Sequence, residues 1–345
     1  MNGPFDPWDE FTNLNAMLPP AEPCMRATRL PGIACSYLAR TVEGAPSFLI
    51  ALDKSRVRVP RAPIALEHLE VVYETHCVVQ ECDGDASEGD FALIRCLASD
   101  YRLHEYFVRS IYPVVTALPA NATVLDVAAA VHSVVELFRA LGAPPREPIT
   151  GLWGELFLIH ASNAPEMLVE AWRQLGHEKF DFSGGGVRLE VKTTESAERV
   201  HSFALEQLID SDSEPTVIAS LLVRPASSGL AIPDMLRSIS RKLVHRHDLV
   251  SRLWNTVART LGIELEHVSE VRFEERHALR EMRFVRARNV PSVVAPNPPE
   301  VFDVRFKSNL THVEAMLPAD LLALGGLLTA LNSPDSDSAG KSRSG

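Results

Sequence analysis

The sequence predicts a mixed α+β fold, in which a β-rich region precedes a second region of helices and strands. Short apolar runs between residues 30 and 100 are bounded by Gly, Asp or Pro, which is typical of antiparallel strands. Residues 123–141 instead carry valines at helical spacing. Further on, residues 179–192 read as two strands joined by glycines, and residues 217–223 form an apolar run typical of a buried strand.

Length and composition fit an ordinary globular protein. The chain has 345 residues, of which 46% are hydrophobic and 23% charged, enough for two or three domains. No apolar run approaches the ~20 residues of a membrane span, and Met1–Asp6 lacks the basic and apolar segments of a secretion signal. The five cysteines include no Cys-x-x-Cys pair, which favours reduced thiols. We therefore expect a cytoplasmic protein without a membrane partner.

The charge is unevenly distributed along the chain. The net charge of −11 argues against a nucleic-acid partner. However, residues 226–345 hold 16 Lys and Arg against 14 Asp and Glu, so this third alone is basic. A metal site needs local acid and a phosphate-binding surface needs local base, and this division allows both.

The first 145 residues are predicted to form one domain, which serves recognition or partner binding. Residues 1–25 are expected to be an irregular arm, and Glu88-Gly89-Asp90 is expected to be a turn, as is Asp83-Gly84-Asp85. A Gly142 C-cap followed by Pro144-Pro145 ends the second helix and sets the boundary. The expected strands are 47–52, 70–73, 77–79 and 91–97, and the expected helices are 101–118 and 123–141.

The second domain is predicted to span residues 146–331, with a helical C-terminal extension. The tail, residues 332–345, has no apolar content and is expected to be disordered. The expected helices of this domain are 150–160, 165–176 and 231–261, and its later strands are 217–223, 271–273 and 281–285.

The hairpin in this domain brings acidic residues together. With a two-residue loop at Gly185-Gly186, Ser183 pairs with Arg188 and Asp181 with Glu190, and directly opposite residues point to the same face. Side chains alternate along a strand, so Lys192 shares the face of Glu190. A three-residue loop would separate the two acids, although a bulge could restore the register.

Two carboxylates and a lysine on one strand face suit a divalent metal. Mg²⁺ binds one or two carboxylates, waters and a phosphate oxygen, and it lowers the pKa of bound water. Asp181 and Glu190 are the candidate ligands, with the Val191 carbonyl as a further one, and Lys192 is the candidate cation for the attacking hydroxide or the phosphate charge. Mn²⁺ is the alternative ion.

Glu155 is the candidate third acid and metal ligand. It stands alone in the apolar stretch Gly151–Ile159, and helical geometry points it into an apolar surface. A buried carboxylate is costly unless a partner offsets its charge. A metal or a lysine would do so, whereas a simpler alternative is that Glu155 pairs with an arginine.

Other features have structural explanations beside functional ones. Glu-x-Lys commonly lies on a solvated strand face, and His201 is more often a satisfied strand histidine than a phosphate contact. His245-Arg246-His247 lacks a third ligand at the usual metal spacing. The basic run could contact a DNA backbone or form a salt-bridged surface. This run comprises Arg272, Arg276, Arg280, Arg283, Arg286 and Arg288.

Together these residues resemble the PD-(D/E)XK phosphodiesterase superfamily, and within it the bacterial group called "PD-(D/E)XK motif protein". The segments that carry the resemblance are Gly151–Leu156, Trp172, Asp181-Phe182, Glu190–Thr194 and Glu206–Leu208. It implies a restriction-endonuclease-like core, a central mixed sheet flanked by helices. By resemblance, Glu155 matches the first-helix acid, Asp181 the metal-binding aspartate, Glu190 and Lys192 the Glu-x-Lys pair, and Gln207 the glutamine of some exonuclease-like members. Phe180 stands where the superfamily name places proline.

We therefore predict a Mg²⁺-dependent DNA endonuclease. The resemblance suggests a restriction or anti-phage system, with a homodimer or defence-system proteins as partners. The alternative is a catalytically inactive, restriction-endonuclease-like subunit that binds DNA or assists assembly. A third possibility, an enzyme for a small phosphorylated molecule, requires a closed pocket rather than a basic groove.

Overall fold

The computed structural model confirms a mixed α+β fold and divides the chain into two compact units. The first comprises residues 1–145 with 244–266, and the second residues 146–243 with 267–345. The predicted domain boundaries, 1–145 and 146–331, and the recognition role of the first domain remain predictions. The structure describes residues 5–16, 24–32, 36–53, 61–81, 86–141, 148–173, 179–262, 265, 268–293 and 303–331.

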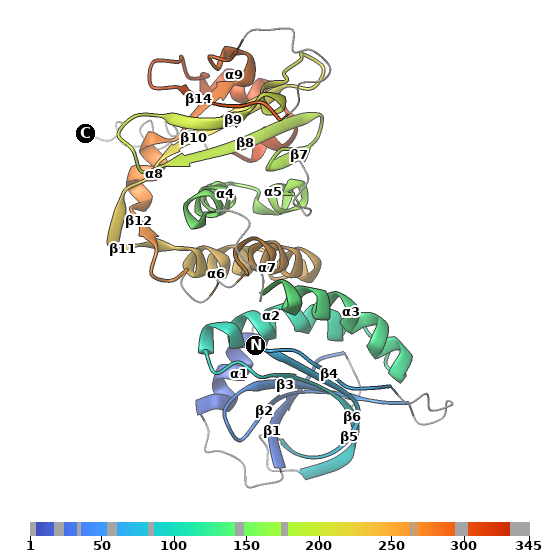
Figure 1. Ribbon diagram of the computed structural model, residues 1–345. Helices are drawn as coiled ribbons and strands as arrows, with labels where there is room; N and C mark the ends of the chain where they lie inside the picture. Colours follow the sequence, from blue (N-terminus) through green and yellow to red (C-terminus); the bar gives the residue numbers. More distant parts are fainter. Residues whose placement is uncertain are drawn as a thin grey trace, which may run out of the picture. The chain divides into compact units, whose positions relative to one another are not determined.

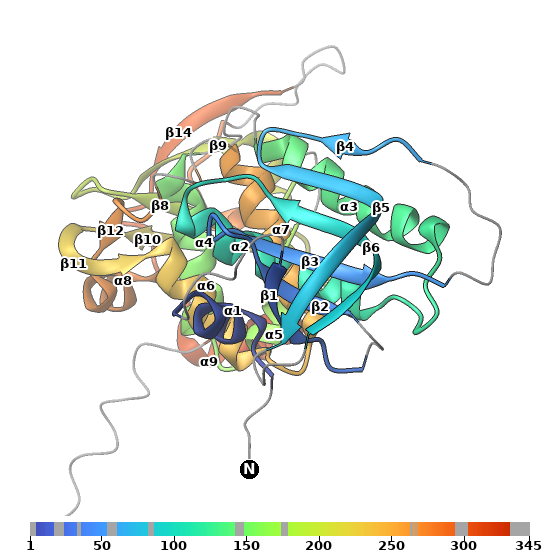
Figure 2. The same ribbon diagram turned by 90° about the horizontal axis from the view of Figure 1, so that it is seen from below.

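A sheet that closes on itself forms the base of the first unit (Figure 1). Its strands are β1 (Cys24–Arg29), β2 (Tyr37–Arg40), β3 (Pro46–Ala51), β4 (Ile64–Ala65), β5 (Leu69–Glu81) and β6 (Ala86–Cys96). They lie in the order β1-β2-β3-β6-β5-β4, and β1 also pairs in parallel with the end of β5. The register shift between Val72 and Thr75 marks an irregularity of β5 that increases its bend. The curled strands are seen from below in Figure 2.

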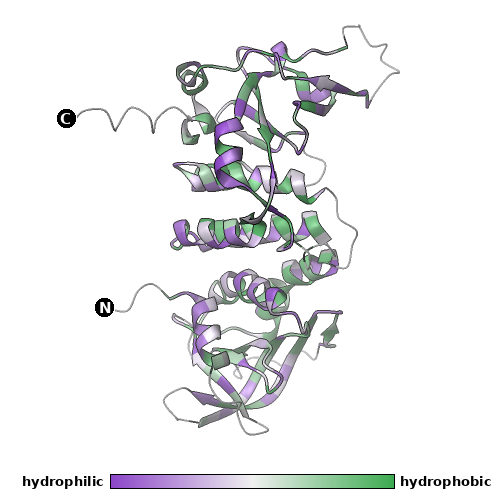
Figure 3. Ribbon diagram, turned by 90° about the vertical axis from the view of Figure 1, so that its left-hand side faces the viewer, coloured by the Kyte–Doolittle hydropathy of each residue, from purple (hydrophilic) through white to green (hydrophobic). Residues whose placement is uncertain are grey.

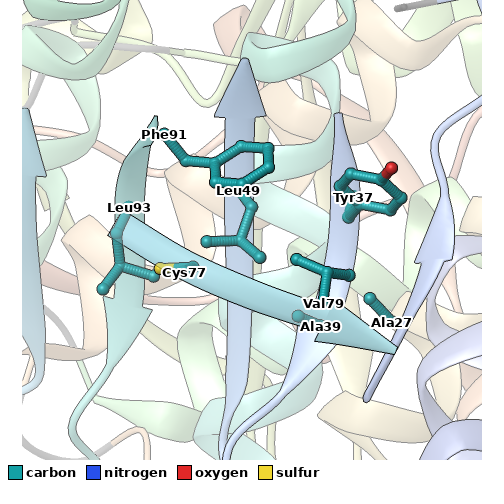
Figure 4. Close-up of a cluster of buried hydrophobic side chains, with 8 residues drawn as sticks. All are labelled: Ala27, Tyr37, Ala39, Leu49, Cys77, Val79, Phe91 and Leu93. Carbon is teal, nitrogen blue, oxygen red and sulfur yellow. The ribbon is translucent and has the colours of Figure 1, made fainter. Parts of the chain in front are cut away.

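Alternating residues of these strands fill the space inside the curled sheet. Residues two apart point to the same face, as Tyr37 and Ala39 do on β2 and Phe91 and Leu93 on β6. Figure 4 shows the side chains gathered between the strands. The cluster comprises Ala27, Tyr37, Ala39, Leu49, Cys77, Val79, Phe91 and Leu93.

Helices complete the first unit, four of them within the residues that the structure describes. They are α1 (Pro7–Ala16), α2 (Tyr101–Thr116), α3 (Val124–Leu141) and α7 (His247–Leu261). Phe107 of α2 lies 5.9 Å, ring to ring, from Phe48 of β3, so α2 covers the sheet. Helix α7 comes from the later part of the chain and packs on α2 and α3. Its Trp254 lies 6.1 Å from Tyr106 of α2.

The second unit contains a mixed four-stranded sheet. Its strands are β7 (Phe182–Gly184), β8 (Val187–Thr194), β10 (Thr216–Leu222) and β13 (Arg283–Arg286), in the order β13-β10-β8-β7. Strands β8 and β10 are parallel, whereas the β7–β8 and β10–β13 pairs are antiparallel. Helix α4 (Ile149–Ala161) packs on β8 and on α6 (Ile232–Lys242). The sheet thus brings the hairpin acids and the helix acid into one unit.

Shorter elements surround this sheet. β9 (Val200–Ala204) pairs with β14 (Arg305–Asn309), and β11 (Pro225–Ala231) with β12 (Arg272–Phe273). Hydrophobic and hydrophilic residues share the helices (Figure 3), as expected for elements with one buried face. The other elements given within the described residues are α5 (Pro165–Ala171), α8 (Glu275–Glu281), α9 (Pro318–Ala323), η1 (Leu205–Leu208), η3 (Ala287–Asn289) and η4 (Gly326–Ala330). No helix in the described ranges is long and apolar enough to cross a membrane.

Three local predictions are wrong. Residues 7–16 of the expected arm form α1, which buries Trp8, Phe11 and Leu14. Gly89 is not in a turn but pairs with Cys77 inside the long β5–β6 hairpin.

The third concerns a helix of the later chain. The helix expected to reach residue 176 ends at Ala171, because Trp172 has extended backbone and bridges to Phe182. The stretch 231–261 is mostly helical, as predicted, and it divides into α6 and α7, which belong to different units. The expected turn at 83–85, the Gly142 cap and the tail 332–345 lie outside the described residues.

Candidate functional site

The β7–β8 hairpin has the predicted register. Ser183 pairs with Arg188, Gly184 with Val187 and Phe182 with Leu189. The loop residues Gly185 and Gly186 have φ values of +62° and +76°, which L-residues with side chains adopt only with strain. Such a pair of positive φ values is what a two-residue hairpin loop with a type I′ turn requires.

Asp181 and Glu190 come together one step beyond the paired residues. Asp181 is 6% exposed and Glu190 3% exposed. The Val191 N–H donates to Asp181 Oδ2 over 2.8 Å, which fixes this carboxylate against strand β8. The structure therefore places Asp181, Glu190 and Val191 in one buried cluster.

Lys192 and Gln207 both bind Glu190. Lys192 Nζ donates to Glu190 Oε1 over 2.7 Å, and Gln207 Nε2 donates to the same oxygen over 2.6 Å. Gln207 Oε1 accepts from Lys192 Nζ at 3.3 Å and from the Ala204 N–H at 3.1 Å, so its amide has a defined orientation. The other oxygen, Glu190 Oε2, is buried and has no hydrogen-bond partner within the described part of the chain.

Burial and a neighbouring charge perturb Glu190. Burial raises the pKa of this carboxyl first, and the Asp181 charge raises it further, to about 8. Lys192 and Arg173 act in the opposite direction. A carboxyl whose pKa is raised by burial and by a second acid is typical of functional sites, and a bound cation would favour its ionised form.

Glu155 lies on α4 and has partners of its own. Trp172 Nε1 donates to its Oε2 over 2.6 Å and Arg173 Nη2 to its Oε1 over 2.8 Å, while only 3% of the residue is exposed. The predicted burial is thus confirmed, and the charge is offset by an arginine rather than a lysine. Gly154 lets α4 approach β8, because a Cβ there would overlap the Thr193 hydroxyl.

Sequence analysis missed Arg173. Its Nε lies 3.5 Å from Asp181 Oδ1, so its guanidinium connects Asp181 with Glu155. The available signal was that Arg173 is the first Lys or Arg after Glu155 in the sequence. Its approach to Asp181 depends on the antiparallel bridge between Trp172 and Phe182, which the sequence pattern did not reveal.

Among the described residues, the donor set that could hold a divalent ion consists of two carboxylates rather than three. Asp181 and Glu190 supply two adjacent carboxylates, and the unpartnered Glu190 Oε2 is an available oxygen. Within the described ranges, however, no three Asp, Glu, His or Cys side chains are grouped so as to hold a metal. Because Mg²⁺ needs only one or two carboxylates beside waters and phosphate, the pair is sufficient for it.

The remaining candidates have structural roles. His201 is buried with Nε2 2.8 Å from Ser220 Oγ, and burial followed by the charges of Lys192 and Arg199 lowers its pKa to about 4. It is a satisfied strand histidine, as the simpler explanation predicted. In the 245–247 stretch, Arg246 pairs with Asp248, and the His247 ring contacts Tyr112.

Most of the basic run forms ion pairs. Arg286 Nη2 lies 2.6 Å from Asp210 Oδ1, and Arg288 Nη1 lies 2.9 Å from Asp212 Oδ1. Arg272 pairs with Asp234 and Arg280 with Glu281. Ion pairing therefore accounts for these four arginines, at the surface for three of them and in a buried pair for Arg286.

Comparison with known proteins adds one match. A family model described as "Putative PD-(D/E)XK family member, (DUF4420)" matches residues 9–311. This range includes most of both compact units, so the family model matches the strands of the closed sheet as well as the β7–β8 hairpin. Neither the curated proteins nor the solved structures yield a match.

Proposed function

The chain belongs to the DUF4420 family, and from this we propose that it is a divalent-metal-dependent DNA endonuclease with a restriction-endonuclease-like core in its second unit. The observation that carries the proposal is the pair of buried acids Asp181 and Glu190 with the partly buried Lys192 beside Glu190 at the β7–β8 hairpin. A structural protein gains little from two adjacent buried acids, because like charges in a buried site are costly.

Asp181 and Glu190 would hold the ion. The N–H and C=O of a strand residue point to the same side, and the Val191 N–H points to Asp181, so its carbonyl is the further candidate ligand. The ion would supply an activated water and would offset charge on the phosphate. Mg²⁺ is the proposed ion, with Mn²⁺ as the alternative.

Lys192 and Gln207 would orient the reacting groups. Lys192 is held by Glu190 and by the Gln207 amide oxygen, so its ammonium group stays beside the carboxylate cluster. There it would stabilise negative charge on a phosphate oxygen or orient an attacking water. Gln207 fixes the direction of the Glu190 carboxylate through its amide nitrogen.

DNA cleavage tests the proposal. Supercoiled plasmid and linear DNA are incubated with Mg²⁺ or Mn²⁺ and wild-type protein, Asp181→Asn or Lys192→Met. The exposed residues Asp212 and Lys242 supply the matched controls Asp212→Asn and Lys242→Met. We expect cleavage by the wild type and both controls, and a loss of about 10²-fold or more in the two site variants. Equal cleavage by all five proteins would refute the site.

One observation favours the second candidate, a non-catalytic subunit that binds DNA or assists assembly. Arg173 already provides a positive charge beside Glu155 and Asp181, as a fold without a metal ion could require. This candidate predicts DNA binding without cleavage, at any divalent ion tested. A gel-shift experiment on the same five proteins, read together with the cleavage assay, separates the two candidates, because binding without cleavage supports only the second.

The biological setting is part of the proposal. The resemblance suggests restriction or anti-phage defence, so phage plating on cells that carry wild-type protein or Asp181→Asn provides the test. Equal plating efficiency would remove this setting without affecting the proposed chemistry. A homodimer or a defence partner would allow both DNA strands to be cut, and sedimentation with and without DNA measures this.

A further inference from the structure

Arg173 lies between two acids of the candidate site and is fixed there by the backbone. Its main-chain N–H donates to the Asp181 carbonyl over 2.8 Å, and the preceding Trp172 bridges to Phe182. The side chain is 14% exposed and is thus largely enclosed. Its position beside Asp181 therefore follows from main-chain pairing and not from a chance approach of a flexible side chain.

The guanidinium is shared unequally. Nη2 donates to Glu155 Oε1 at 2.8 Å, within normal hydrogen-bond length, whereas Nε stands 3.5 Å from Asp181 Oδ1. Glu155 also receives the Trp172 indole N–H on its other oxygen. The stronger contact is therefore to Glu155, and Asp181 feels the same charge at a longer distance.

We propose that Arg173 is an internal counter-ion of the metal site and that Glu155 is a positioning residue which acts on that site through Arg173. This inference rests on the proposed function. Arg173 stabilises Asp181 when no ion is bound and repels an incoming divalent ion. Glu155 draws the guanidinium toward itself, which leaves the Asp181 carboxylate more available to the ion.

The two residues should have opposite effects on metal affinity. A positive charge within a few Å of a binding site disfavours a second cation, so Arg173→Met should tighten Mn²⁺ binding about tenfold. Glu155→Gln frees the guanidinium to pair with Asp181 and should weaken binding about tenfold. If Glu155 acts through Arg173, the double variant should bind Mn²⁺ at least as tightly as the wild type. If Glu155 is itself a ligand, the double variant should stay weak.

Calorimetric titration of the full chain with Mn²⁺, without DNA, measures these affinities. The set comprises wild type, Arg173→Met, Arg173→Lys, Glu155→Gln and the double variant, with Arg305→Met of an exposed ion pair as the control. Arg173→Lys keeps the charge and should bind like the wild type. Thermal unfolding in EDTA establishes that each protein is folded. If Arg173→Met does not fold because Glu155 is left as an unpaired buried charge, the double variant, which lacks both charges, still provides the measurement.

The outcomes separate this inference from the proposed function. Recovery of affinity in the double variant supports it. A double variant as weak as Glu155→Gln overturns it and restores Glu155 as a direct ligand, while the proposed function stands. Wild-type protein that binds no Mn²⁺, or binds it unchanged after Asp181→Asn, overturns both.

Discussion

The interior of the closed sheet in the first unit and strand β8 in the second are built by the same alternation but carry opposite chemistry. In the closed sheet, residues two apart such as Cys77 and Val79 fill the interior with apolar side chains (Figure 4). On β8 the apolar set is interleaved with Glu190 and Lys192, of which Glu190 is almost fully buried. The first arrangement maximises apolar burial, whereas the second accepts buried charge, as functional sites commonly do.

The largest expected effect separates activity from stability at the β8 site. Lys192→Met should lower DNA cleavage by about 10²-fold or more, because it removes the cation beside the acids. At pH 6 the Glu190 carboxyl is protonated, because its pKa is about 8. Removal of the lysine charge therefore leaves no buried carboxylate unpaired at Glu190, and the free energy of unfolding should change by less than about 1 kcal/mol. Cleavage assays and urea unfolding at pH 6 measure both quantities. A large loss of stability with retained cleavage would contradict the contrast.

Leu49→Ala should do the reverse in the first unit. Leu49 is fully buried inside the closed sheet, so the substitution should cost about 2–5 kcal/mol of stability. Val42→Ala, at an exposed position, is the matched control and should stay within about 0.5 kcal/mol. Urea unfolding with hydrogen exchange of the β3 amides follows this unit. At urea concentrations too low to unfold Leu49→Ala, its Mn²⁺ affinity should equal that of the wild type.

Glu190 makes the stability of the metal-free protein depend on pH. Its pKa is raised from 4.5 in the unfolded chain to about 8 in the fold. Between these values the folded protein holds a proton that the unfolded chain has lost, so stability falls as pH rises. Glu190→Gln should remove this decline, worth on the order of 4 kcal/mol, in unfolding curves recorded from pH 5 to 8.5 in EDTA. Parallel curves for the two proteins would show that Glu190 ionises normally.

Bound metal should offset the loss of stability at higher pH. Since a divalent ion binds the ionised carboxylate, Mn²⁺ affinity of the wild type should increase toward pH 8. Calorimetry at pH 6, 7 and 8 provides the measurement, and an affinity that is independent of pH would contradict it.

The smallest effects concern the hairpin loop. Gly186→Ala meets no atom within 4 Å but places a side chain at positive φ, which costs about 1–2 kcal/mol. Gly185→Ala adds a Cβ only 2.7 Å from Gly326 Cα and should cost more. Thermal unfolding of the two variants compares strain alone with strain plus steric overlap. Equal losses would indicate that η4 moves away without cost.

Local rules explain what the sequence could predict. The hairpin register follows from two adjacent glycines and the alternation of side chains, so Asp181 and Glu190 could be paired without knowing the rest of the fold. Burial of Glu155 followed likewise from its apolar helix neighbours. The three-residue spacing of Trp8, Phe11 and Leu14 was a helix signal within the supposed arm.

Non-local contacts explain what the sequence could not predict. Arg173 acquires its role only because Trp172 bridges to Phe182 and the Arg173 N–H donates to the Asp181 carbonyl. Gly89 signals a turn by its residue type, yet the pairing of β5 with β6 keeps it in a strand. The division of residues 231–261 depends on which helices α6 and α7 pack against, and helix propensity alone does not specify this.

The return of α7 to the first unit makes the two units inseparable as gene fragments. The chain passes between them three times, near residues 145, 243 and 266. A fragment cut at residue 145 would lack α7 and would expose Tyr106, which Trp254 contacts. Recombination at a single junction therefore cannot exchange either unit between relatives. Any evolutionary change of partner by this protein must proceed by substitution within a unit or by the simultaneous exchange of two segments.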